Sequence, residues 1–84
     1  MNIIFYEHNN RCPVYDFIKK LEATDRARIL ASLKNIEELG LDSPRVEFRQ
    51  IRGRLWEIKI KTKHTGYRIF YVAVTLKTLV LLHA

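Results

Sequence analysis

The sequence is poor in the residues that build disulfides, phosphate-binding loops and metal centres. It contains one cysteine, Cys12, and three glycines among 84 residues. A single cysteine excludes an intramolecular disulfide and fits a reducing cytoplasm. There is no Gly-rich phosphate loop and no Gly-x-Ser-x-Gly nucleophile motif. His8, His64 and His83 are far apart, with no partner at metal-ligand spacing, so we expect no metal ion and no cofactor.

The chain also lacks the features of an exported or membrane-spanning protein. Its first residues, MNIIFYEHNN, contain no basic segment followed by an apolar one. No apolar run approaches the roughly 20 residues of a membrane span. With 48% hydrophobic residues, the composition is that of a globular protein. We expect one small soluble domain over residues 1–84, located in the cytoplasm and without a membrane partner.

The net charge of +6 is concentrated in one part of the chain. Residues 1–44 carry six basic and seven acidic side chains, whereas residues 45–68 carry eight basic and two acidic ones. Phe48, Trp56 and Tyr67 lie within this basic block. Basic residues interleaved with aromatic ones are typical of proteins that bind polyanions such as nucleic acids. A solvated basic face without a ligand is the alternative that charge alone leaves open.

The first half of the chain predicts one strand and two helices. Residues 2–7 are rich in Ile, Phe and Tyr and predict a strand. Pro13 suits the first turn of a helix, and Thr24 is the expected N-cap of a second helix that ends at Gly40. Apolar residues recur at helical spacing in both segments: Val14, Phe17, Ile18 and Leu21, then Ile29, Leu30, Leu33, Ile36 and Leu39.

The second half predicts four strands separated by short turns. They span residues 46–51, 55–61, 67–74 and 78–83. The resulting order is β-α-α-β-β-β. It predicts an α+β fold in which a two-helix hairpin packs on one face of a mostly antiparallel sheet.

Alternation along the central strands predicts what lines the other face. The even-numbered residues of strand 55–61 are apolar, and its odd-numbered residues from 57 onwards are charged. If Ile58 pairs with Ile69, then Arg68 lies beside Lys59 on the face that the helices leave bare. A slip of one residue would invert this assignment.

The basic residues suit metal-independent cleavage of RNA by its own 2′-hydroxyl. This reaction requires a base for the 2′-proton, cations around the phosphate and an acid for the leaving oxygen. Lys59 and Arg68 are the candidate cations, and His83 is the candidate acid or base because imidazole changes charge near neutral pH. The candidate RNA contacts are Arg49, Arg52, Arg54, Lys61 and Tyr67, with Tyr67 or Tyr71 as the residue that stacks on a base. Two alternatives stay open: an ion pair of Arg68 with Glu57 alone, and a core position for Tyr71.

Several segments in order resemble the HigB-like branch of the RelE/ParE toxin superfamily. They are LWEIK at 55–59, YRIFY at 67–71 and LVLLHA at 79–84, with VYDFIKKL at 14–21 and Leu39-Gly40 upstream. The resemblance covers nearly the whole chain. It implies a RelE-like fold and the toxin of a type II toxin–antitoxin pair. Such a toxin is a metal-independent endoribonuclease that cleaves mRNA on the ribosome, inhibits translation and is neutralised by a helix-turn-helix antitoxin.

The resemblance also assigns roles to three residues. The family's strand arginine corresponds to Lys59, its Tyr-Arg arginine to Arg68, and its terminal histidine to His83. The family's Phe and Lys-Lys segment does not follow Ala84, so we expect impaired activity. A gyrase-inhibiting toxin of the ParE type and a catalytically inactive domain that binds an antitoxin are the alternative functions.

Overall fold

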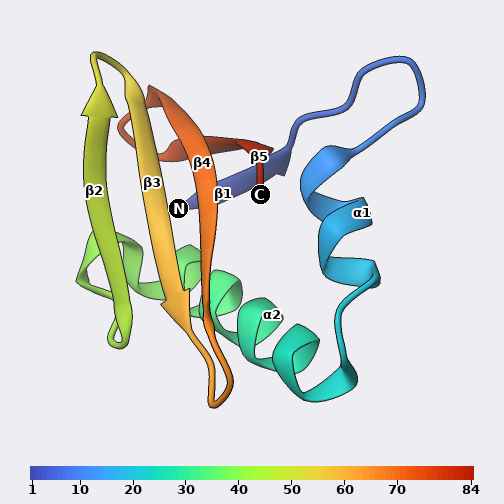
Figure 1. The fold of residues 1–84 in the computed structure, drawn as a ribbon. Coiled ribbons are helices and arrows are strands. Elements are labelled where there is room, and N and C mark those ends of the chain that lie inside the picture. The colour runs from blue at the N-terminus through green and yellow to red at the C-terminus, as the bar shows by residue number, and fades with distance from the viewer.

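The fold is α+β, as predicted, and is described by a computed structural model that covers residues 1–84 (Figure 1). Its elements in chain order are β1 (Asn2–Phe5), α1 (Pro13–Lys19), α2 (Ala23–Leu39), the short 3-10 turn η1 (Gly40–Asp42), β2 (Val46–Arg52), β3 (Leu55–Lys61), β4 (Gly66–Thr75) and β5 (Thr78–His83).

The five strands form one mixed sheet in the order β1-β5-β4-β3-β2. β1 pairs with β5 in parallel, and the other neighbours are antiparallel. The chain therefore starts at one edge, passes through both helices to the other edge, and returns strand by strand. In Figure 1, α2 runs behind β4 and β3, while α1 lies beside β5 and β1. Neither helix combines the length and the apolar character that a membrane-spanning helix requires.

The predicted pairing of the central strands is confirmed. Ile58 lies opposite Ile69, and Lys59 lies opposite Arg68. Ile58, Ile60 and Ile69 are completely buried in a cluster with side chains of both helices. Each such side chain contributes about 1.5–3 kcal/mol through removal from water. We call this side of the sheet the covered face, and the opposite side the bare face.

Helix α2 is anchored by fewer residues than the sequence predicted, whereas all four predicted residues of α1 are buried or pack against the core. In α2, Ile29, Leu33 and Ile36 are buried, whereas Leu30 and Leu39 are 45% and 53% exposed. Positions 29, 33 and 36 already form one stripe at helical spacing, so the expected positions of the other two leucines were wrong.

The predicted N-cap of α2 was also wrong. Glu22 holds that position, and Thr24 lies inside the first turn, where its hydroxyl donates to Glu22 Oε1 at 3.5 Å. The helix thus begins slightly earlier than the capping pattern indicated.

The segment between α2 and β2 contains two residues in the left-handed region of backbone conformation. Gly40 ends α2 there with φ of 65°, as predicted, and its N–H donates to the carbonyl of Ile36. Arg45 has φ of 64°. A residue with a Cβ pays about 1–2 kcal/mol for this conformation, so Arg45 is a strained position directly before β2.

Candidate functional site

Charged and aromatic side chains gather in two neighbouring rows across the bare face. The strand pairings place His83, Phe70, Glu57 and Arg49 in one row, from β5 to β2. They place Arg68, Lys59 and Glu47 in the next row, from β4 to β2. Directly opposite side chains have their Cβ atoms about 4.5–5.5 Å apart and diagonal neighbours about 7–8 Å, so long side chains of the two rows can reach each other, as Arg68 and Glu57 do.

Arg68 and Lys59 form the cationic centre of this arrangement. Arg68 Nε lies 3.6 Å from Glu57 Oε1, so the predicted alternative of an ion pair is present. The side chain of Arg68 nevertheless remains 56% exposed, whereas that of Glu57 is only 4% exposed. Arg68 therefore has one carboxylate beneath it and still presents guanidinium N–H groups to solvent. The stem of Lys59 lies over Gly66, where a Cβ would meet Lys59 Cε at 3.6 Å.

His83 reaches the bare face through an irregularity in β5. Phe70 pairs with His83 and Tyr71 with Leu81, so Leu82 has no partner of its own on β4. Regular alternation would place His83 on the same face as the buried Leu81. The extra residue acts as a β-bulge, a feature common beside active sites because it re-aims side chains. His83 is exposed and lies next to Phe70.

The aromatic residue on the bare face is Phe70, whereas the predicted stacking residue, Tyr67, lies on the covered face. The Tyr67 hydroxyl donates to Asp25 Oδ2 at 2.6 Å, and its ring packs edge-on against Phe17. This hydrogen bond, followed by desolvation, raises the pKa of Tyr67. Tyr71 is a core residue, and burial raises its pKa. Both tyrosines lie on the covered face because side chains alternate between the two faces of a strand, and each tyrosine is two positions from the buried Ile69.

The remaining predicted RNA contacts lie at the borders of the bare face. Arg49 is opposite Glu57, and Arg52 is opposite Leu55, both on the edge strand β2. Arg54 is exposed in the β2–β3 turn. Lys61, at the end of β3, forms an exposed ion pair with Glu47 at 3.9 Å.

Glu57 lies at the centre of the site, although the sequence suggested it only as a partner for Arg68. It lies between Phe70 and Arg49 in the first row and contacts Arg68 of the second. Its odd-numbered position beside Lys59 placed it on the bare face, but nothing in the sequence indicated its burial. No group of three or more His, Cys, Asp or Glu side chains forms a metal-binding cluster.

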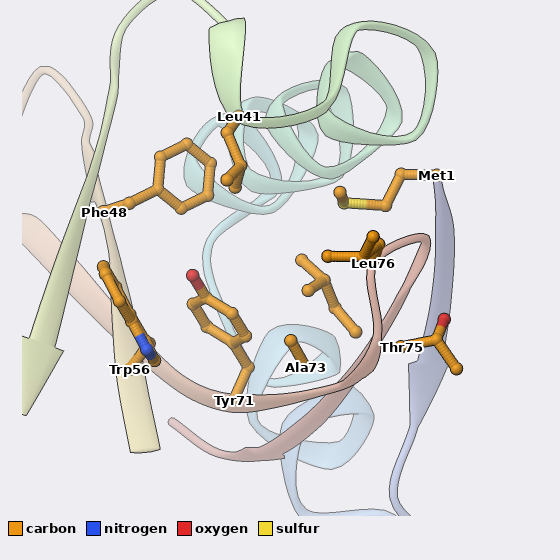
Figure 2. A pocket seen from close by; sticks show the side chains of 9 residues that line it. Met1, Leu41, Phe48, Trp56, Tyr71, Ala73, Thr75 and Leu76 are labelled. Carbon is orange, nitrogen blue, oxygen red and sulfur yellow. The ribbon is translucent and has the colours of Figure 1, made fainter. Parts of the chain in front are cut away.

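The main apolar hollow belongs to the covered face, beyond the end of α2 (Figure 2). Its volume is about 210 Å³, and no charged side chain lines it. The Tyr71 hydroxyl points into it towards Leu41. The lining residues are Met1, Leu41, Phe48, Trp56, Tyr71, Ala73, Thr75, Leu76 and Leu79. The hollow is separate from the charged rows and offers no group for phosphate chemistry.

Comparison with known families identifies a family for this chain. A family model described as phage-derived protein Gp49-like (DUF891) matches residues 16–84, from α1 to beyond the end of β5. The chain belongs to this family. The Gp49-like family is part of the RelE-like toxin group, and membership is compatible with the toxin of a toxin–antitoxin system. The Gp49-like chain matches no curated protein and no solved structure.

Proposed function

We propose that this Gp49-like protein is the toxin of a type II toxin–antitoxin pair and cleaves mRNA on the ribosome, as HigB-like toxins do. The observation that carries the proposal is the position of Lys59 directly opposite Arg68 on the bare face, in the row beside Glu57, Phe70 and His83. Two cations on a face that no helix covers can bind the anionic phosphodiester of RNA. The neighbouring Glu57 and His83 can exchange protons with the reacting oxygens. The protein would then act in the cytoplasm, where its ribosomal substrate lies.

The reaction needs only RNA and the side chains of the two rows. A 2′-oxygen attacks the adjacent phosphorus while its proton passes to a carboxylate or imidazole, for which Glu57 and His83 are the candidates. Arg68 and Lys59 bind the non-bridging oxygens as negative charge develops on the phosphorane. The bond from phosphorus to the 5′-oxygen breaks, and that oxygen takes a proton from the second group. The products are a 2′,3′-cyclic phosphate and a 5′-hydroxyl.

Phe70 is the proposed stacking residue in place of Tyr67. It lies between Glu57 and His83, so a base stacked on its ring would hold the neighbouring phosphate near both groups. Arg49, Arg52, Arg54 and Lys61 would contact phosphates on either side. Their contribution is electrostatic and independent of base identity.

Cleavage in a bacterial translation extract tests the proposal. Wild-type protein should cut translated mRNA and leave cyclic phosphate ends, and Arg68→Ala should lower the rate by about 10²–10³-fold, the usual effect of removing one transition-state donor. Arg11→Ala, in the exposed loop before α1, is the matched control and should cleave normally. Intact mRNA in the extract, together with DNA damage signalling in cells that express the protein, would instead support a gyrase inhibitor. Full activity of Arg68→Ala would refute the site.

We further propose that the partner is a helix-turn-helix antitoxin. Coexpression with the product of the adjacent reading frame should yield a stable complex and suppress cleavage. A catalytically inactive domain would form the same complex but leave mRNA intact when expressed alone.

A further inference from the structure

A basic groove borders the second row and connects the bare face with α2. It is lined by Arg28, Arg45, Val46, Glu47, Lys59 and Lys61 and encloses about 480 Å³. A second hollow, which also includes Arg28 and Lys61, continues it along the β3–β4 turn to Lys63. We call these two hollows together the edge groove. Because Lys59 belongs both to the edge groove and to the candidate site, the two are continuous.

The cations of the edge groove are largely unneutralised. Glu47 is engaged with Lys61, and the buried Asp25 accepts the hydroxyl of Tyr67. No carboxylate lies within 4.0 Å of the charged atoms of Arg28, Arg45, Lys59 or Lys63. Like charges held close together repel one another unless an anion lies between them. The groove therefore has the electrostatics of an anion-binding surface.

The backbone at Arg45 is a second and independent observation. Arg45 is the one residue with positive φ that is neither glycine nor asparagine. Arginine has no side-chain preference for this region, whereas glycine occupies it without strain. Arg45 lines the edge groove beside Arg28, and both also line a further hollow at the α2 side. Residues held in strained backbone conformations cluster at active sites and ligand-binding sites.

We infer that the edge groove binds the RNA backbone next to the cleaved phosphodiester, with Arg28 and Arg45 as phosphate contacts. This inference rests on the proposed function. An RNA strand whose reacting phosphate lies between Lys59 and Arg68 continues past Lys61 towards α2, where Arg28 of the helix and Arg45, directly before β2, contact the following phosphates. Planar guanidinium groups suit such contacts, since each can donate two hydrogen bonds to one phosphate.

Salt-dependent binding of a single-stranded oligoribonucleotide tests this assignment. The slope of log affinity against log salt should fall in magnitude by about 0.7 for each lost phosphate contact. Arg28→Ala and Arg45→Gly should each show this loss, and the double variant should lose about 1.4. Arg45→Lys should retain the slope. Lys34→Ala, on an exposed part of α2, is the control and should bind like wild type.

Thermal unfolding separates loss of a contact from loss of fold. Arg45→Gly removes a strained residue, so its melting temperature should equal or exceed that of wild type while RNA binding weakens. A lower melting temperature together with an unchanged salt slope would overturn the inference. Binding of polyglutamate that depends on Arg28 and Arg45, with RNA binding unaffected, would overturn it in favour of an acidic protein partner.

The two proposals can fail independently. Cleavage of mRNA by wild type, with no effect of Arg28→Ala or Arg45→Gly on the slope, would refute the edge groove and leave the proposed function standing. Reduced slopes in a protein that never cleaves translated mRNA would refute the proposed function and leave the groove as an RNA-binding surface.

Discussion

The covered face and the bare face are formed by alternate residues of the same strands, but the covered face packs against the helices and the bare face carries charged side chains. On β4, Ile69 is completely buried beneath the helices, while its neighbour Arg68 is largely exposed and lies opposite Lys59. The covered face is mainly apolar; its core cluster includes Tyr71, and Tyr67 packs against that cluster. The bare face holds the charges of Arg68, Lys59 and the buried Glu57. We therefore expect alternate residues of one strand to serve different purposes, with one set stabilising the fold and the other serving the proposed activity. Substitutions on the two faces should affect stability and activity separately.

The largest expected effect is on the covered face. Ile69→Ala should lower the free energy of unfolding by about 2–5 kcal/mol, because it leaves a cavity in a completely buried cluster. Arg68→Ala, one residue earlier, should cost less, about 1–3 kcal/mol, because its own side chain is exposed but its removal leaves the buried Glu57 carboxylate without that partner. Urea denaturation of both variants measures the difference. Equal losses would show that the two faces share the stabilisation of the sheet.

The second prediction concerns Glu57, the buried carboxylate of the bare face. Glu57→Leu should change the free energy of unfolding by no more than about 1 kcal/mol, because an apolar side chain replaces a desolvated charge and Arg68 can be hydrated. RNA cleavage should nevertheless fall at least about tenfold, since the reaction loses a proton acceptor or the group that orients Arg68. Glu38→Leu, an exposed carboxylate of α2 outside both rows, is the control. A large loss of stability with normal cleavage would assign Glu57 to the fold.

The two faces also show how much of the site could be predicted from the sequence. Alternation and strand pairing were enough to place Lys59 beside Arg68, because a core of isoleucines fixes the register. The same rule, applied to Tyr67, would have put it on the covered face. Its assignment as an RNA contact followed from residue type and missed the hydrogen bond with Asp25, 42 positions away.

Other features of the site could not be obtained from pattern alone. The unpaired Leu82 reverses the alternation of β5, and its position depends on how β5 pairs with β4. Arg28 lies in the half of the chain that carries no excess of positive charge, so composition gave no reason to include it. Only the fold brings α2 next to the start of β2 and places Arg28 beside Arg45.

The third prediction uses pH to examine the covered face at Tyr67. A hydrogen bond to Asp25 raises the Tyr67 pKa above its usual value of 10.0, so the native state favours the neutral phenol. The stabilisation is fully present below pH 10 and is lost as pH rises through the raised pKa. Wild type should therefore be more stable than Tyr67→Phe at pH 8, and the difference should shrink above pH 10. Tyr71 is present in both proteins and cancels from the comparison.

Urea midpoints at several pH values, together with phenolate absorbance, measure this convergence. RNA cleavage by Tyr67→Phe should equal that of wild type, because the ring lies beneath the sheet and not on the bare face. Loss of cleavage in a stable Tyr67→Phe protein would restore the role that the sequence suggested. A difference in stability that widens above pH 10 would contradict the hydrogen bond as the cause of the shifted pKa.

The smallest expected effect comes from the rim of the apolar hollow in Figure 2, where the covered face ends. Leu76 lines the hollow but is 96% exposed at the β4–β5 turn, whereas Leu79 lines it and is 2% exposed. Leu76→Ser should therefore change the free energy of unfolding by no more than about 0.5 kcal/mol, while Leu79→Ala should cost about 2–5 kcal/mol. Urea denaturation distinguishes these values. A loss of more than about 1 kcal/mol for Leu76→Ser would mean that the turn folds over the hollow in solution and that the covered face extends further than the helices.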